Sequence, residues 1–147
     1  MIMVLGEDYN MSGEAASRTN IKLPGIQTDL IKAIRDEFPD KKIILILMNG
    51  RPLDLTIEDS LVDTILEIWY PGTSGGLGVA DILFGKYNPS AKLPITFPRN
   101  LGQVPIYYNV KNTGRPISIE NPTEDYKSNY IDSPNTPLYP FGHGLSY

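Results

Sequence analysis

The residue of this chain best suited to acid–base chemistry is Glu14, which lies in a polar loop after a short apolar run. The run, residues 1–5, is long enough for one buried strand and too short for most helices. Loops that leave the carboxyl end of a strand hold the ligand sites of open α/β sheets. A glutamate between Gly13 and Ala15 can lean into a cleft and donate a proton if its surroundings keep it protonated. The sequence of this loop, residues 6–18, therefore predicts that Glu14 is one of the two groups of an acid–base pair.

Other charged residues of the same loop bear on this interpretation. Glu7 and Asp8 compete with Glu14 for the role, and a loop glutamate is in most proteins simply solvated. Arg18 lies four residues after Glu14. A guanidinium close to Glu14 would favour the ionised carboxylate, which works against a general acid. We therefore expect Arg18 to anchor the loop and to point away from Glu14.

The remaining candidates for chemistry have weaker contexts. His143, the single histidine, lies between two glycines without a visible partner, so packing or surface exposure is favoured over catalysis. Ser12 and Ser146 lack the context of a nucleophile elbow. The glycine-rich stretch 71–78 matches neither a P-loop nor a dinucleotide fingerprint and favours a strand-to-helix turn. Three tyrosines could stack on sugar rings, although a core or interface role is favoured for them: Tyr9, Tyr107 and Tyr108.

The elements that would position these residues alternate along the chain. Residues 42–48 form a continuous apolar run, which is typical of a strand covered on both faces, and residues 64–69 predict a third strand. Helices are expected at 26–38, 57–61 and 75–84, between and after the strands. In the first of them, Ile26, Leu30, Ile34 and Phe38 recur every four residues and so define one helix face.

This order predicts an α/β fold, a three-layer sandwich with a mostly parallel sheet. Residues 1–86 would form its core. Residues 87–147 hold most of the prolines and aromatic residues and little periodicity. Disordered segments are poor in aromatic residues, so we expect this second part to be an ordered but irregular segment that covers the sandwich.

Length and composition exclude several classes of protein. The 147 residues fit one domain. The net charge of −4, without a basic run, argues against nucleic-acid binding. The chain has no cysteine and one histidine, so neither a metal site nor another cofactor is expected. No stretch is apolar enough for a membrane span. Because the chain begins almost inside a strand, we expect it to be a piece of a longer protein whose sheet is truncated at its start.

Ten stretches, in order, resemble the C-terminal α/β-sandwich domain of glycoside hydrolase family 3, and in particular its branch of bacterial periplasmic β-glucosidases. The resemblance covers nearly the whole chain. The stretches that carry it are residues 6–7, 12–18, 23–27, 48–53, 69–72 with 75–76, 83–94, 96–99, 102–108, 112–116 and 138–147.

The resemblance implies a function that this chain performs together with another domain. Members of the family are retaining β-glycosidases whose nucleophilic aspartate lies on a separate N-terminal (β/α)8 barrel. In many members this second domain supplies the acid/base glutamate, and the matching position is Glu14. The implied substrates are terminal β-linked glucosides or oligosaccharides, and the implied location of the parent enzyme is periplasmic or secreted.

The resemblance also indicates what this chain lacks. Neither the barrel nor the fibronectin-like domain that often follows the family domain has a counterpart here, so we expect the isolated chain to be inactive. A truncated sheet exposes an edge, through which a homodimer could form. Two alternatives stay open: a non-catalytic carbohydrate-binding or structural domain of the same enzyme, and a flavodoxin-like nucleotide binder, which the glycine-rich stretch does not favour.

Overall fold

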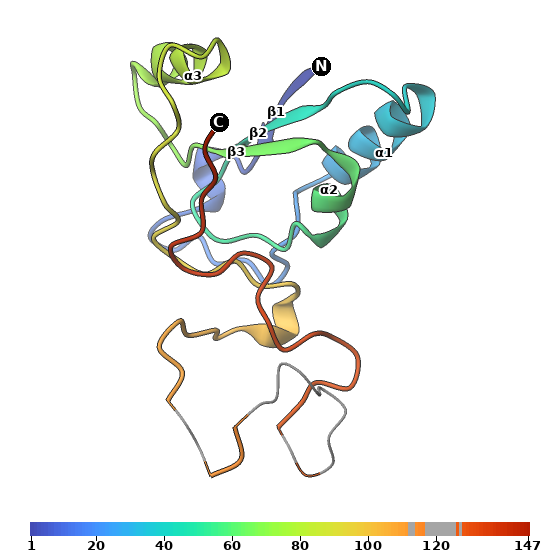
Figure 1. The fold of residues 1–147 in the computed structure, drawn as a ribbon, viewed down its shortest axis with the longest axis vertical. Helices are drawn as coiled ribbons and strands as arrows, with labels where there is room; N and C mark the ends of the chain where they lie inside the picture. Colours follow the sequence, from blue (N-terminus) through green and yellow to red (C-terminus); the bar gives the residue numbers. More distant parts are fainter. Residues whose placement is uncertain (112–113, 117–125, 127) are drawn as a thin grey trace.

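The predicted alternation of strands and helices is confirmed. The computed structural model describes residues 1–111, 114–116, 126 and 128–147; the expected irregular segment 87–147 also includes residues that lie outside the described ones. The elements are β1 (Ile2–Gly6), η1 (Tyr9–Met11), α1 (Gln27–Glu37), β2 (Ile44–Met48), α2 (Thr56–Leu61), β3 (Thr64–Glu67), α3 (Gly75–Leu83) and η2 (Leu101–Gln103) (Figure 1).

The strands form a parallel sheet in the order β1-β2-β3. Met3 pairs with Leu45, and Leu45 pairs with Ile65. The central strand β2 is buried on both faces, with Leu45, Ile46 and Leu47 at most 4% exposed, as its continuous apolar run predicted. The α/β class and the parallel sheet predicted from the sequence are therefore confirmed.

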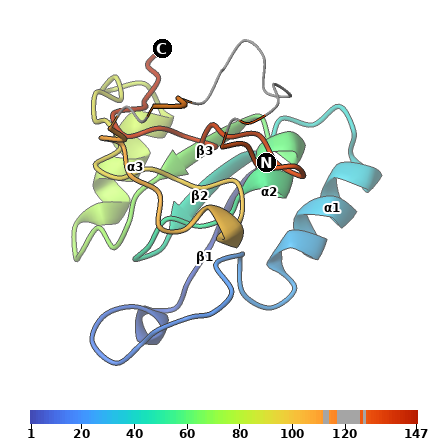
Figure 2. The ribbon, with the colours of Figure 1, turned by 90° about the horizontal axis from the view of Figure 1, so that it is seen from below.

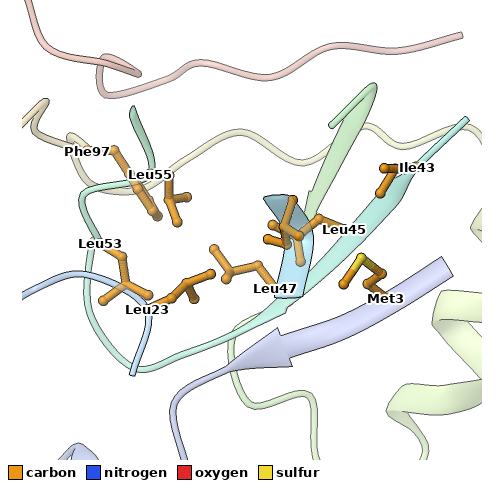
Figure 3. Packing of buried hydrophobic residues seen from close by; sticks show 9 residues of the cluster. Met3, Leu23, Ile43, Leu45, Leu47, Leu53, Leu55 and Phe97 are labelled. Atoms are coloured by element: carbon orange, nitrogen blue, oxygen red, sulfur yellow. The ribbon is translucent and has the colours of Figure 1, made fainter. Parts of the chain in front are cut away.

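The main core lies on one face of this sheet. Side chains at odd positions of the strands pack there against Ile31 of α1 and against residues of the loop between β2 and α2 (Figure 3). Phe97, from the C-terminal segment, joins the same cluster and is 1% exposed. Its backbone forms an antiparallel bridge with Tyr139, and its N–H donates to the Tyr139 carbonyl at 2.8 Å. The C-terminal segment is thus held to the sheet through a buried aromatic side chain.

Helix α1 buries a different face from the one that the sequence pattern marks. Ile31 is fully buried and Ile34 partly so, whereas Ile26, Leu30 and Phe38 are 78%, 45% and 42% exposed. The reason is geometric: each four-residue step turns an α-helix by 400°, so the stripe drifts by about 120° over three steps. The helix was predicted correctly, but only part of its apolar stripe faces the core.

The opposite face of the sheet is less completely covered. Helix α3 lies on the other side of the strands from α1 (Figure 2). A groove lined by Val4, Ile46 and Met48 of the sheet and by Gly75 and Val79 of α3 separates the two elements. At the end of this face Ile2 and Val4 stay about half exposed. Among the described residues no helix has the length and apolarity that crossing a membrane would require.

Candidate active site

Three segments meet at the carboxyl edge of the sheet, the edge at which the sequence predicted a site. They are the loop after β1 (residues 7–18), the turn after β2 (residues 49–52) and the residues after β3 (68–72). Tyr70, from the third segment, donates its hydroxyl hydrogen to the Asp8 carbonyl of the first segment at 3.2 Å. Burial and the charge of Glu7 raise the pKa of this hydroxyl, so it remains a donor. The loop after β1 is therefore in contact with the segment that follows β3.

Glu14 lies at the exposed part of this loop. The flanking residues Gly13 and Ala15 have left-handed φ values of 101° and 60°. No hydrogen bond or ion pair joins the Glu14 carboxylate to any residue that the structure describes. Its side chain is consequently available to a group outside this chain, and the structure does not enclose it in the sandwich.

Glu7, at the base of the loop, is the opposite case: its side chain is fully buried. Arg18 donates to Glu7 Oε1 at 2.6 Å, and Arg51 Nε lies 3.0 Å from the same oxygen. The backbone N–H of Gly50 donates to Glu7 Oε2 at 3.3 Å. Two guanidinium groups and one peptide N–H thus compensate a carboxylate that has lost its water.

Arg18 forms its ion pair with Glu7 and not with Glu14. Its Nη2 also donates to the Lys22 carbonyl at 3.0 Å, so the side chain joins the base of the loop to the segment that follows it. This arrangement supports the role of loop anchor, and among the described residues no ion pair involves the Glu14 carboxylate.

Arg51 is a functional candidate that the sequence reasoning missed. Beyond its contact with Glu7, its Nη2 donates to the carbonyl of Met11 and, at 2.9 Å, to the carbonyl of Ala16. These carbonyls lie before and after Glu14 along the loop. In the sequence Arg51 is part of an Asn-Gly-Arg-Pro turn, and nothing in that motif indicates which loop its side chain will reach.

Two glycines allow the close approaches on which this arrangement depends. Gly6 has a φ of +141°, and a Cβ there would lie 1.7 Å from the Met48 carbonyl oxygen. A Cβ on Gly50 would lie 2.0 Å from the Ser12 Oγ. The loop therefore passes directly over the turn after β2, with Ser12 filling the space that a side chain at residue 50 would need.

The end of β1 is fixed by a side chain of α1. The Gly6 N–H donates to Gln27 Oε1 at 2.8 Å, and Gln27 Nε2 donates to the Gly6 carbonyl at 2.9 Å. Both peptide groups of one residue are thus bound by one carboxamide. The point at which the loop leaves the sheet is therefore defined from two sides, by Gln27 and by β2.

A second carboxylate that the sequence reasoning missed, Glu67, ends β3. Its Oε1 accepts the Trp69 N–H at 2.8 Å, and burial raises the pKa of the carboxyl to about 7. Its Oε2 and the Asn49 Oδ1 are both buried, and neither has a hydrogen-bond partner within the described part of the chain. Asn49 Nδ2 is already used, because it donates to the Arg51 carbonyl at 2.6 Å. A proton on Glu67 Oε2 would provide the missing donor.

The structure gives no catalytic context to the other candidates from the sequence. His143 stacks on Tyr139 with ring centroids 5.2 Å apart, the packing role that was favoured for it. Asp8 caps η1 by accepting the Asn10 N–H, and Ser146 is exposed. The stretch 71–78 leads from β3 into α3, as the turn interpretation predicted. A core role is wrong for the three tyrosines, which are 64–74% exposed: Tyr9, Tyr107 and Tyr108.

No metal site is visible at this edge or elsewhere in the part of the chain that is described, where no group of three or more His, Cys, Asp or Glu side chains could hold an ion. The arrangement consists of the Glu14 carboxylate, which has no hydrogen-bond or ion-pair partner among the described residues, on a loop that is fastened by a charged cluster of the buried Glu7 and the partly buried Arg18 and Arg51. Chemically, such an arrangement can transfer a proton to or from a molecule that lies against the loop.

Comparison with known proteins agrees with the motifs found in the sequence. All of residues 1–147 match the family model described as glycosyl hydrolase family 3 C-terminal domain. The periplasmic β-glucosidase of Salmonella typhimurium is 55% identical over 147 residues, which are 100% of this chain and 19% of that protein. A β-xylosidase of Formosa agariphila is 40% identical over 147 residues, again 100% of this chain and 19% of its own length.

Solved structures give the same result for the fold. The crystal structure of a β-glucosidase from Listeria innocua in complex with glucose superposes with a TM-score of 0.93 and 45% identity, covering 99% of this chain and 20% of that one. A β-glucosidase from Erythrobacter marinus gives a TM-score of 0.82 at 39% identity, with 99% of this chain and 18% of that chain covered. This chain therefore spans about a fifth of the length of these relatives.

Proposed function

Because this chain belongs to the glycosyl hydrolase family 3 C-terminal domain family, we propose that it works as one domain of a retaining β-glucosidase that hydrolyses terminal β-linked glucosyl residues. In this proposal Glu14 is the acid/base residue, and an N-terminal (β/α)8 barrel contributes the nucleophilic carboxylate. By its similarity to the Salmonella protein, the whole enzyme is proposed to be periplasmic.

The observation that supports the role of Glu14 is its placement. It is exposed and unpaired among the described residues, on a loop whose base is held by the charged cluster of the buried Glu7 with the partly buried Arg18 and Arg51. A retaining glycosidase needs two carboxyl groups about 5–5.5 Å apart, one attacking the anomeric carbon and one protonating the leaving oxygen. A loop that is fixed at its base and open at its tip can bring the second carboxyl to a site formed elsewhere.

The proposed reaction has two steps. In the first, protonated Glu14 gives its proton to the glycosidic oxygen while the nucleophile forms a glycosyl–enzyme ester and the aglycone leaves. In the second, the ionised Glu14 takes a proton from water, which attacks the anomeric carbon, releases glucose and restores both carboxyl groups. No metal or cofactor takes part in either step.

The test is Glu14→Gln in the full-length enzyme that contains this domain. Substrates with a poor leaving group, such as alkyl β-glucosides, need protonation, whereas 2,4-dinitrophenyl β-glucoside does not. We expect kcat/KM for the alkyl substrate to fall about 10²–10⁴-fold, with a much smaller loss for the dinitrophenyl substrate. Azide should restore turnover of the activated substrate by attacking the glycosyl–enzyme.

The matched control is Glu37→Gln, since Glu37 is also exposed but lies at the end of α1. This substitution should leave kcat/KM unchanged for both substrates. Unchanged kinetics for Glu14→Gln would instead favour the second candidate, a carbohydrate-binding or structural domain without catalytic groups. The exposed tyrosines, Tyr9 in particular because it shares the loop with Glu14, are the observation on which that candidate rests.

Two further proposals concern the chain by itself. Without a nucleophile it should not hydrolyse aryl β-glucosides, and clear turnover would contradict the two-domain proposal. Its sheet ends at β1, which pairs only with β2 among the described strands, so we propose that the isolated chain self-associates through that edge. Size-exclusion chromatography with light scattering would test this, and a monomer at all concentrations would contradict it.

A further inference from the structure

Arg51 contacts both the buried base of the Glu14 loop and the backbone on either side of Glu14. Its Nε lies 3.0 Å from Glu7 Oε1, and its Nη2 donates to the Met11 carbonyl and, at 2.9 Å, to the Ala16 carbonyl. Met11 and Ala16 are three residues before and two residues after Glu14. One planar group is thus bonded to both arms of the loop that carries the carboxylate.

The turn from which Arg51 extends is itself fixed. It directly follows the buried strand β2, and the Gly50 N–H donates to Glu7 Oε2 at 3.3 Å. Asn49, which is fully buried, donates to the Arg51 carbonyl at 2.6 Å. The Arg51 side chain is only 20% exposed, so it has little freedom to choose other partners. Its guanidinium is therefore held relative to the sheet and not only relative to the loop.

The contribution of Arg51 differs from that of Arg18. Arg18 belongs to the loop and binds Glu7 and Lys22, so its contacts lie at the base and end of the loop. Among the described side chains only that of Arg51 donates to the carbonyls of residues 11 and 16. Since Gly13 and Ala15 adopt left-handed φ values between these points, the tip has no regular secondary structure of its own to keep its shape.

We propose that Arg51 is a positioning residue for the acid/base group: its guanidinium ties the two arms of the loop to the end of β2 and thereby sets where the Glu14 carboxylate meets the glycosidic oxygen. This inference rests on the proposed function of Glu14. Arg51 touches neither substrate nor reacting atoms in this scheme. Its effect on catalysis is confined to the proton transfers to and from Glu14, which occur in both steps of the proposed reaction.

The geometry requires arginine and not merely a positive charge. Five N–H donors in a rigid fork allow one side chain to serve a carboxylate and two carbonyls at fixed angles. A lysine would keep the charge beside Glu7 but would lose the simultaneous contacts to both arms of the loop. Arg51→Lys therefore separates the positioning of the loop from the neutralisation of the buried carboxylate.

The test measures Arg51→Lys in the full-length enzyme with the alkyl and dinitrophenyl β-glucosides used for Glu14→Gln. A displacement of about 1 Å at a catalytic group costs about 100-fold in rate, so kcat/KM for the alkyl substrate should fall about 100-fold relative to that for the dinitrophenyl substrate. The ratio of the two values does not depend on the fraction of folded enzyme. If the lysine variant yields no soluble enzyme, Arg51→Gln is measured in the same way.

The matched control is Arg35→Lys. Arg35 also donates to backbone carbonyls, those of Leu61, Pro39 and Lys41, and pairs with Asp63, but it does so at the amino end of the sheet. Its substitution should leave the ratio unchanged. If Arg51→Lys lowers kcat/KM equally for both substrates, while Glu14→Gln lowers it mainly for the alkyl substrate, Arg51 is only structural and the inference is wrong. If Glu14→Gln does not discriminate, the proposed function fails first, and the inference fails with it.

Discussion

Replacing Glu67 with glutamine should remove a pH dependence of folding stability and leave the fold unchanged. Glu67 is partly buried at the end of β3. Its Oε2 is buried and has no hydrogen-bond partner among the described residues, like the Oδ1 of its neighbour Asn49. Both oxygens are satisfied if the Glu67 carboxyl carries a proton. Glutamine mimics this protonated form, because its Nε2 can donate to Asn49 while its Oε1 accepts the Trp69 N–H.

The magnitude follows from the pKa of this carboxyl. Burial raises it from an ordinary 4.5 to about 7 in the folded chain, so the folded state binds the proton more tightly than the unfolded state does. The resulting stability is fully present below pH 4.5 and is lost as the pH rises through 7. The loss amounts to about 1 kcal/mol at pH 5 and about 3 kcal/mol at pH 8.

The glutamine variant does not titrate, so the other ionisable groups cancel when the two proteins are compared at one pH. We compare the free energy of unfolding of Glu67→Gln with that of the wild type at each pH. The difference in favour of the variant should be about 2 kcal/mol larger at pH 8 than at pH 5. Urea unfolding followed by tryptophan fluorescence suits this measurement, because Trp69 is the single tryptophan and lies two residues from the substitution. A stability difference that stays constant between the two pH values would refute the reasoning.

Two further substitutions test the packing of the loop at the carboxyl edge. Glu7→Gln removes the negative charge that two partly buried arginines share, and it should lower the free energy of unfolding by about 3–5 kcal/mol in a urea titration. A loss below about 1 kcal/mol would mean that water solvates the cluster. Gly50→Ala places a methyl group 2.0 Å from the Ser12 Oγ, and it should cost about 1–3 kcal/mol in thermal unfolding. Adding Ser12→Gly should recover part of that loss, and strict additivity would show that the two residues do not touch.

The sheet could be predicted from the sequence because its information is local. The run around β2 is apolar at every position, which indicates burial on both faces whatever the neighbouring elements are. The buried face of α1 could not be predicted in the same way. Ile26, Leu30 and Phe38 satisfy a helical pattern as well as Ile31 does, and the choice depends on where the sheet lies relative to the helix axis.

The residues of the candidate site also differ in whether local sequence or the three-dimensional fold reveals them. Residue types alone mark Glu14 as a candidate in a loop after a strand, and the resemblance to the family implies the acid/base role for it, which stays a prediction. Arg51 is 37 residues from Glu14 in the sequence, and its role depends on the register of β1 and β2, which brings Gly6 opposite Met48. Glu67 was missed although a charged residue within an apolar strand run is unusual, because the pattern shows that a strand is present but not whether its last side chain points into the protein.

The carboxamide of Gln27 also limits how the sheet can be extended. Peptide groups alternate in direction along a strand, and those of Met1 and Glu7 bond to β2, so the outward-facing groups of β1 belong to Ile2, Val4 and Gly6. Gln27 already occupies both groups of Gly6. A further strand added at this edge could therefore form backbone hydrogen bonds only with Ile2 and Val4. In this way α1 limits how many residues of a neighbouring strand can pair with β1.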